Sequence, residues 1–166
     1  TVTWTTSSSS IATVSSVGLV TSVATGTATI TATSGSASAT AAVTVSDFLL
    51  AANGVTLTCS AADVGETGEV GGVTYTKRSK AQIDALVDAE DYAPLATTCT
   101  SGVTDMNEMF KDATAFNGDI SSWDVSSVTK MNDMFYNAAA FNQNVNSWDV
   151  SSVTDMNEMF RDATAF

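Results

Sequence analysis

The sequence of 166 residues contains no histidine, a single proline and only two cysteines. Without histidine the chain cannot form a Ser-His-Asp or Cys-His catalytic group, or a zinc site with histidine ligands. Basic residues are also scarce, because 6 Lys and Arg stand against 18 Asp and Glu and leave a net charge of −12. This imbalance argues against binding to nucleic acid, which requires clustered positive charge, and against binding to an anionic membrane surface.

Long apolar segments are missing as well. The longest purely apolar run, residues 48–52, is far too short to cross a membrane, so we expect no membrane insertion. No signal peptide is visible, and the chain begins at Thr1 without methionine. Together these features favour a processed or excerpted chain.

Charge is absent from the whole of residues 1–46, where more than half of the residues are serine or threonine. A disordered stalk of the mucin type is one interpretation of such a composition. Against it, proline is missing, and apolar residues alternate with threonine through residues 27–33 and again through residues 40–45. This period of two, punctuated by glycines, predicts strands of an all-β domain.

What the sequence does contain is a repeat of 25 residues at its C-terminal end. The first copy covers residues 103–127, the second covers residues 128–152, and a third begins at residue 153 and stops at residue 166. The first and third copies differ at one aligned position, Lys111 against Arg161. A fixed period of this length predicts a solenoid, in which each unit buries its apolar face against its neighbours. Because the third copy lacks its second half, we expect that more repeats follow.

Each repeat is predicted to contain a short helix and then a short strand. Apolar residues recur at spacings of three and four, which is typical of one helix face, and a threonine precedes each helix as its cap. The Trp-Asp-Val segments at residues 123–125 and 148–150 predict strands that pair between copies. We expect a continuous core of aromatic and methionine side chains, formed by Met106, Phe110, Phe116, Trp123, Met131, Phe135, Phe141, Trp148, Met156 and Phe160.

The pattern V-T-x-M-N-x-M-F-x-x-A-x-A-F-N, followed by W-D-V-S-S, resembles the BspA-type repeat of bacterial surface proteins, a family similar to leucine-rich repeats. The resemblance covers residues 103–166 at nearly every patterned position. It implies a secreted or cell-surface protein, often an adhesin, and it supplies no catalytic residue.

Residues 1–46 resemble the bacterial immunoglobulin-like domain that occurs in tandem on surface proteins. The segment that follows Trp4 and the closing A-T-A-A-V-T-V-S carry this resemblance. In that family further strands precede the tryptophan, so the domain is expected to be incomplete at its N-terminal side. Such domains usually act as spacers.

Residues 47–102 are expected to form the cap that closes the first repeat, because the ends of a solenoid need one. Ser79 and Gln82 form a capping-box signal, and the residues after them follow helical spacing up to Pro94. The surface-protein resemblance favours a disulfide between Cys59 and Cys99 over two free thiols. The three basic residues at positions 77, 78 and 80 could bind an anion, although a solvated turn is the simpler interpretation.

Asp124 and Asp149 occupy the same position in successive repeats and are expected to point outward from adjacent strands as a ladder. One interpretation is that Ca²⁺ bridges the two carboxylates. The simpler one is that each carboxylate accepts backbone N–H groups of its own turn. Carboxylates are plentiful in the chain as a whole, so residue types alone leave open an acid pair for glycoside cleavage elsewhere. Because most of these acids recur with the repeat, whereas a catalytic residue is needed once, we expect no enzyme activity and no required cofactor.

The sequence thus predicts an α+β chain with three parts. A partial all-β immunoglobulin-like sandwich covers residues 1–46, a disulfide-stapled cap covers residues 47–102, and an α/β solenoid of 25-residue units covers residues 103–166. We expect a bacterial extracellular surface protein that adheres to a protein or glycan ligand on another surface. The alternative is a structural subunit of an extracellular fibre or sheath, whose ends are completed by copies of itself.

Overall fold

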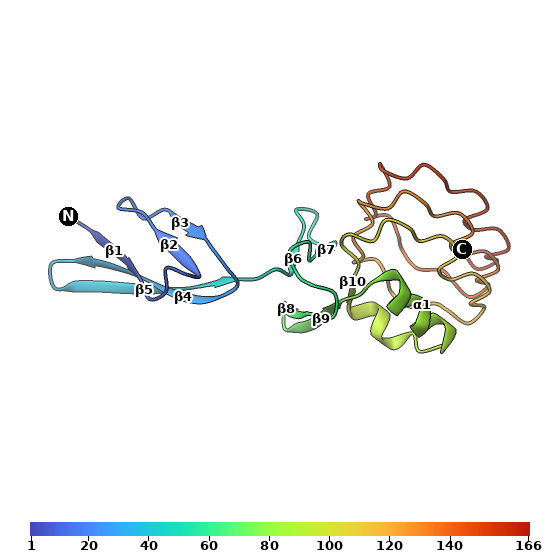
Figure 1. Ribbon diagram of the computed structural model, residues 1–166, viewed down its shortest axis with the longest axis horizontal. Coiled ribbons are helices and arrows are strands. Elements are labelled where there is room, and N and C mark those ends of the chain that lie inside the picture. The colour runs from blue at the N-terminus through green and yellow to red at the C-terminus, as the bar shows by residue number, and fades with distance from the viewer. The chain divides into compact units, whose positions relative to one another are not determined.

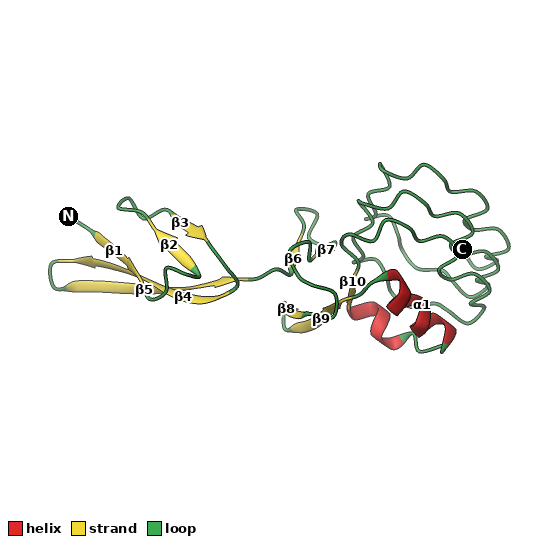
Figure 2. Cartoon of the chain, in the orientation of Figure 1, coloured by secondary structure: helices red, strands yellow, loops and turns green.

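The computed structural model describes all residues, 1–166, and divides them into two compact units, Thr1–Asp47 and Phe48–Phe166. Strands and loops dominate, with a single α-helix and with sheets that remain open (Figure 2). None of the helices is both long and apolar enough to cross a membrane. The second unit contains both the predicted cap and the predicted repeats, and their separation into two domains stays a prediction.

The first unit contains five strands: β1 (Thr3–Thr6), β2 (Ala12–Val14), β3 (Val20–Ser22), β4 (Gly26–Ser34) and β5 (Ala37–Val45). Strands β1, β4 and β5 form an antiparallel sheet in that order, and β2 pairs with β3 in a separate hairpin (Figure 1). The alternation predicted from the sequence is confirmed in β4, where Ala28 and Ile30 are buried while Thr27 and Thr33 are exposed. A period of two places these two sets on opposite faces of the strand.

The core of the first unit is small. Its buried apolar side chains are Ala12, Ala28 and Ile30. Trp4 lies against Gly18, whose φ is +87° and whose added Cβ would stand 2.8 Å from the indole ring. Glycine is therefore needed at this turn both for the left-handed backbone and for space.

The second unit begins with short strands: β6 (Leu49–Leu50), β7 (Leu57–Thr58), β8 (Thr67–Val70), β9 (Val73–Lys77) and β10 (Thr98–Cys99). Strands β6 and β7 form an antiparallel pair, and β9 lies between antiparallel β8 and parallel β10. The helix α1 (Lys80–Asp88) and the 3-10 helix η1 (Ala93–Thr97) connect β9 to β10. The predicted capping box is confirmed, because the Ser79 hydroxyl accepts the Gln82 N–H and the Gln82 side chain accepts the Ser79 N–H.

The repeats over residues 103–166 contain no helix, so the prediction of a short helix in each repeat is wrong. Overlapping turns replace it, as where the Met109 N–H donates to the Met106 carbonyl at 3.3 Å. Two positions of every repeat take a left-handed backbone, with φ of 56° at Glu108 and 61° at Asp112 in the first. Left-handed residues interrupt an α-helix, whereas successive turns keep apolar residues at spacings of three and four. The apolar pattern alone therefore could not distinguish an α-helix from a series of turns.

Two further details of the predicted repeat are also wrong. The Trp-Asp-Val segments form no strands, and parallel bridges join Asp105, Lys130 and Asp155 instead. The threonines expected to cap helices donate their hydroxyls between coils. Thr129 donates to the Thr104 carbonyl at 3.0 Å, and Thr154 donates to the Thr129 carbonyl at 3.1 Å.

Successive coils are joined by a ladder of backbone hydrogen bonds between equivalent segments. Every second N–H of residues 106–112 donates to a carbonyl of the second coil, for example Phe110 to Met134 at 2.9 Å. Residues 131–137 donate in the same way to the third coil, for example Phe135 to Met159 at 2.8 Å. The N–H groups that a helix would use internally are thus satisfied by the neighbouring coil. The coils lie on one another as the yellow-to-red turns in Figure 1.

Two columns of stacked rings run through the coils: Phe110, Phe135 and Phe160 form one, and Phe116, Phe141 and Phe166 form the other. Neighbouring centroids are 5.3 Å apart in the first column and 5.7 Å apart in the second. At the cap, Tyr92 meets Phe116 edge to face, with centroids 5.1 Å apart. The tyrosine therefore closes the second column with a different ring geometry.

The end of the cap accepts the same tryptophan hydrogen bond that a repeat accepts. The Trp148 indole N–H donates to the carbonyl of Ile120 at 3.2 Å. One coil earlier, the Trp123 N–H donates to the carbonyl of Leu95 at 3.0 Å. Leu95 thus takes the place of Ile120, 25 residues before it. The segment from Leu95 onward supplies the surface on which the first full coil is built.

Candidate functional site

Asp124, the first member of the predicted ladder, is only 9% exposed, so the expectation that it points outward is wrong. Its Oδ1 accepts the Ser126 N–H at 3.2 Å and the Ser126 hydroxyl at 2.6 Å. Its Oδ2 accepts the hydroxyl of Ser101, from the cap, at 2.5 Å. The Ser101 hydroxyl in turn accepts the Cys59 N–H at 3.0 Å. Asp124 therefore joins the cap to the first repeat.

Asp149, the second member, is exposed. Its Oδ1 accepts the Ser151 N–H at 3.0 Å, as the backbone interpretation predicts for this turn. Hydrogen bonds from the side chain and the backbone of Ser151 lower the pKa of the Asp149 carboxyl below its ordinary value. Two residues with the same local sequence thus differ because only Asp124 receives a bond from the cap.

Both carboxylates line one hollow of about 300 Å³, which we call the hairpin hollow. Its remaining lining residues come from the β6–β7 hairpin and from two repeats: Ala51, Ala52, Asn53, Thr56, Thr58, Ser126 and Ser147. The Asn53 carboxamide oxygen accepts the Val55 and Thr56 N–H groups at 3.0 Å and fixes the hairpin loop. The lining combines apolar surface with the Asp149 carboxylate and the Thr56 hydroxyl, whereas the Thr58, Ser126 and Ser147 hydroxyls donate to protein oxygens.

The chain contains no group of three or more Asp, Glu, His or Cys side chains that could hold a metal ion. Both carboxylate oxygens of Asp124 accept hydrogen bonds from serine residues, and Oδ1 of Asp149 accepts one as well. Calcium prefers six to eight oxygen ligands, several of them carboxylates. A calcium bridge between Asp124 and Asp149 therefore stays a prediction, with no third acid beside the pair.

A second hollow, of about 390 Å³, lies between the cap and the start of the first repeat; we call it the basic hollow. Its lining residues are Val64, Lys77, Arg78, Ser79, Lys80, Ser101, Gly102, Val103, Thr104 and Asp105. Half of the six basic residues of the chain belong to this set. The sequence signal for an anion site therefore coincides with a concave surface.

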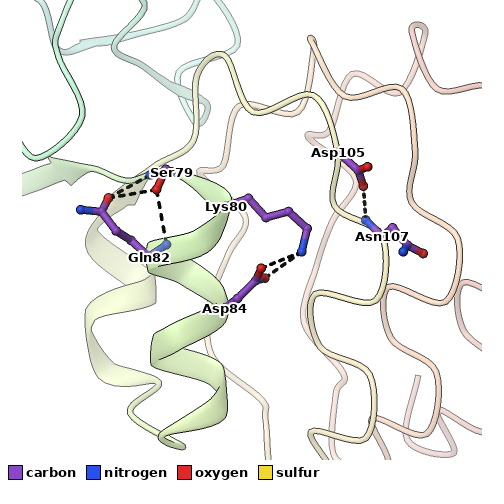
Figure 3. A network of polar contacts seen from close by, with 6 residues as sticks. All are labelled: Ser79, Lys80, Gln82, Asp84, Asp105 and Asn107. Carbon is purple, nitrogen blue, oxygen red and sulfur yellow. Dashed lines mark hydrogen bonds and ion pairs between the residues drawn. The ribbon is translucent and has the colours of Figure 1, made fainter.

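The three basic side chains of the basic hollow are held differently. The Lys77 Nζ donates to the carbonyls of Cys59, Ser60 and Ala62 at 3.0, 3.4 and 2.8 Å. Lys80 pairs with Asp84 at 2.8 Å on the side of α1 that faces the first repeat (Figure 3).

Arg78 anchors the segment before β10. Its Nη1 donates to the Thr98 hydroxyl at 2.7 Å and to the Pro94 carbonyl at 3.5 Å. Burial lowers the pKa of Arg78 below its ordinary value, and the negative charge of Asp91 acts in the opposite direction. Arginine stays protonated in proteins, so the charge remains.

The predicted core residues of the first two repeats lie in the interior. Seven of them are fully buried: Met106, Phe110, Phe116, Trp123, Met131, Phe135 and Phe141. Trp148 is 9% exposed and Phe160 is partly buried against the same cluster. Met156 differs from the prediction, because it is 41% exposed on the third coil.

The disulfide between Cys59 and Cys99 is present, as predicted. It joins β10 to the segment after β7, is fully buried, and belongs to one apolar cluster with Phe48, Leu57 and Ala62. The bridge thus fastens the cap immediately before the first repeat begins.

Sequence reasoning missed Ser101, although a signal was available. The run T-S-G-V-T at residues 100–104 matches V-S-S-V-T at residues 125–129, so Ser101 stands at the position of Ser126. Extending the repeat alignment into the cap would have identified it. The part played by the β6–β7 hairpin had no comparable signal, because its loop lies far from the repeats in sequence.

Comparison with models of protein families gave two matches. The model described as Mycoplasma protein of unknown function, DUF285, matches residues 84–166, half of the chain. The chain belongs to the DUF285 family. The model of the bacterial Ig-like domain (group 2) matches residues 1–45. No curated protein and no solved structure matched the chain.

The DUF285 match begins within α1 and covers the end of the cap and all three repeats. The expected resemblance of the N-terminal segment to a bacterial immunoglobulin-like domain is confirmed. For the repeats, the match supports the DUF285 family, and the BspA type stays a prediction. The two matches together indicate a surface-associated protein.

Proposed function

We propose that this DUF285 protein is a non-catalytic adhesin of the bacterial cell surface, with BspA-type repeats that form a solenoid. In this proposal the second unit binds a protein or glycan on another surface, and the Ig-like unit serves as a spacer. The absence of histidine and the recurrence of acids with the repeat support a binding function over catalysis.

The observation that carries the proposal is the ladder between coils. It holds side chains of equivalent positions beside one another, as where the Asn132 side chain donates to Asn107 and the Asn137 Nδ2 donates to Asp112 at 2.9 Å. Surface groups one coil apart are therefore fixed in direction and spacing. A rigid, regularly spaced surface loses little conformational entropy when it binds.

Within this surface, the hairpin hollow is the contact region that we favour. Asp149 is exposed at the hollow, and Thr56 supplies a hydroxyl to the same lining. The Ser147 hydroxyl donates to the Ser121 carbonyl, and the Asn53 Nδ2 donates to the Thr56 Oγ1. A carboxylate acceptor beside a hydroxyl donor suits sugar hydroxyls or the backbone of a protein loop. Asp124 is already occupied by the cap, so the ligand contact is assigned to Asp149.

The test is to measure binding of the full chain to an array of defined glycans and to a set of purified matrix proteins. We expect at least one specific ligand, with a tenfold loss of affinity in Asp149→Asn, since each 1.4 kcal/mol corresponds to a factor of ten. Asp162→Asn is the matched control, because Asp162 is an exposed repeat aspartate outside this hollow. No binding, or equal loss in both variants, contradicts the proposal.

The second candidate is a subunit of an extracellular fibre or sheath. Exposed apolar side chains of the first unit favour it, because Val17, Leu19 and Val23 are 84%, 67% and 58% exposed. Strand β5 also lies at a sheet edge and carries no charge, which is the composition that permits pairing with another strand. Light scattering at micromolar concentration separates the candidates, since growing assemblies are expected only for the fibre.

A further inference from the structure

The basic hollow concentrates positive charge in a strongly acidic chain. Lys77, Arg78 and Lys80 line it, while the net charge of the whole chain is −12. We propose that the basic hollow binds the carboxylate of an acidic sugar, at a site separate from the hairpin hollow. This second site does not depend on the adhesin proposal, because the basic hollow and the hairpin hollow share no lining residue.

Two of the three basic residues form no salt bridge, and the charge of Asp91 acts on one of them, Arg78, without an ion pair. The ion pairs of the chain involve Lys80, Lys111 and Arg161, and none involves Lys77 or Arg78. Three backbone carbonyls hold the Lys77 ammonium in place, so its charge acts as a fixed local field. Neutral oxygens do not cancel that charge, and a nearby anion is therefore favoured.

Arg78 supplies the direct contact in this proposal. Only its Nη1 donates to protein atoms, namely to Thr98 and Pro94. A guanidinium group has five N–H donors, so the donors on Nε and Nη2 have no protein acceptor. These are the groups that form paired hydrogen bonds with a carboxylate. The bonds of Nη1 meanwhile keep the side chain in position.

Lys80 adds a second, movable charge at the beginning of α1. Its ammonium rests on Asp84, one turn further along the helix, and lies on the side that faces Asp105 (Figure 3). This pair is partly exposed, so its net energy is small and a ligand can compete for the lysine. The first turn of α1 contains no acidic residue, so the positive end of the helix dipole is not offset there.

The shape and the charges favour a sugar over an acidic peptide. A volume of about 390 Å³ lies within the usual range for small-ligand sites, and the Thr104 hydroxyl is available at the wall. Asp105 also lines the hollow, with its Oδ1 accepting the Asn107 N–H at 2.9 Å. That negative charge disfavours a ligand that carries several carboxylates. A polyacidic peptide would meet repulsion from Asp105 and from the acidic repeats.

The test uses the full chain and a glucuronate disaccharide, with its carboxyl-reduced neutral counterpart as the control ligand. Calorimetry at low ionic strength should give binding of the glucuronate at least tenfold tighter than of the neutral sugar, since hydrogen bonds to charged groups are the stronger ones. Added salt should weaken the binding. A sialic acid derivative, tested in parallel, shows whether the hollow prefers the carboxylate of a uronic acid or that of a sialic acid. Equal binding of the neutral sugar, or no binding of either acidic sugar, overturns the proposal.

Variants decide whether the binding occurs in this hollow. Arg78→Gln and Lys80→Gln should weaken glucuronate binding about tenfold or more, whereas Lys111→Gln should leave it unchanged. Asp105→Asn should strengthen it several-fold, because the variant removes the negative charge that faces the ligand. Asp155→Asn is the matched control for Asp105→Asn, since Asp155 forms the same turn with Asn157 at 3.0 Å in the third repeat.

Arg78→Gln could prevent folding, because Arg78 also donates to the Thr98 hydroxyl. In that case the comparison of Asp105→Asn with Asp155→Asn still tests the proposal. Thermal unfolding of each variant shows whether that has happened. Equal effects of Asp105→Asn and Asp155→Asn place the binding elsewhere and overturn the proposal. An acidic tetrapeptide that binds as tightly as the sugar overturns the assignment to a glycan.

Discussion

The two units of this chain satisfy the hydrogen-bonding groups of their backbone in different ways. In the first unit, β2 pairs with β3 and β4 pairs with β5 as hairpins of consecutive strands, the latter through nine consecutive residue pairs, and only β1 pairs with a strand distant in sequence, β4. In the second unit, each coil pairs with the equivalent segment of the next, about 25 residues away. A turn sets the register of the two hairpins in the first unit, and the repeat period sets the register of the coils in the second.

The units differ as much in what they bury. The first unit buries small aliphatic side chains and contains no charged residue before Asp47. The second buries columns of phenylalanine, methionine and tryptophan and adds a disulfide. Hydrophobic stabilisation rises with the apolar area buried, so most of the stability should reside in the second unit. The predictions below test that contrast.

The largest effect is expected from Phe135→Ala in the second coil. Phe135 is fully buried and stacks on Phe110 and Phe160 in its column and on Phe141 in its own coil. Removing a buried ring costs about 3–5 kcal/mol, through lost transfer energy and the cavity left behind. Calorimetry combined with hydrogen exchange should show destabilisation of residues 48–166 while residues 1–47 keep their protection.

Phe166→Ala is the matched control for Phe135→Ala. Phe166 stacks at the end of its column, with its ring 5.7 Å from Phe141, and it is 54% exposed. Its replacement should cost well under half as much, because less apolar area returns to water. Equal losses in the two variants would mean that burial within the stack is not the source of stability.

The disulfide should give the next largest difference between the units. Its cysteines are separated by 40 residues, and closing such a loop contributes roughly 4 kcal/mol in the chain-entropy model. The double variant Cys59→Ala/Cys99→Ala should therefore lower the unfolding temperature of the second unit. The first unit contains no cysteine, so its melting should not respond to a reducing agent. A shift in both units would show that they unfold as one.

Sequence reasoning succeeded where one local pattern corresponds to one structure. Alternation in residues 27–33 identified β4, and the Ser79–Gln82 signal identified the start of α1. In both cases the residues that set the pattern are close in sequence. The burial of Trp123 was also predictable, because a repeated aromatic residue in a stacked unit has to be covered.

The repeat conformation was beyond prediction, because it depends on neighbouring coils. Residues 106–116 have the spacing of a helix face, yet every second N–H of residues 106–112 bonds to the next coil, and the N–H groups between them close turns within their own coil. Glu108 at φ 56° is uncommon for a non-glycine residue, and its N–H donates to the Asn132 carbonyl of the next coil at 3.1 Å. The environment of Asp124 was hidden for the same reason, since Ser101 reaches it from the cap.

A smaller effect should come from the alternation of charge between coils. Lys130 lies between Asp105 and Asp155 in the column of parallel bridges. Lys130→Asp would place three carboxylates side by side and cost about 0.2–1 kcal/mol. The loss should shrink in high salt, because the side chains are at least partly exposed. Lys130→Gln controls for the lost lysine, and unfolding in denaturant at two salt concentrations measures both variants.

The smallest effect concerns acid, to which the two units should respond differently. Residues 1–46 contain no acidic or basic side chain, so the stability of the first unit should change little between pH 7 and pH 3. In the second unit, Ser151 lowers the pKa of Asp149, so this carboxyl stabilises the folded state above its ordinary pKa. That contribution is lost as the pH falls through the lowered folded pKa.

Ser151→Ala should move the pKa of Asp149 back toward its ordinary value, as read from its carboxyl NMR titration. Ser147→Ala, whose hydroxyl donates to the Ser121 carbonyl instead, should leave that titration unchanged. If Asp149 titrates identically in all three proteins, its turn is not held by Ser151 in solution, and the acid response of the second unit has another origin.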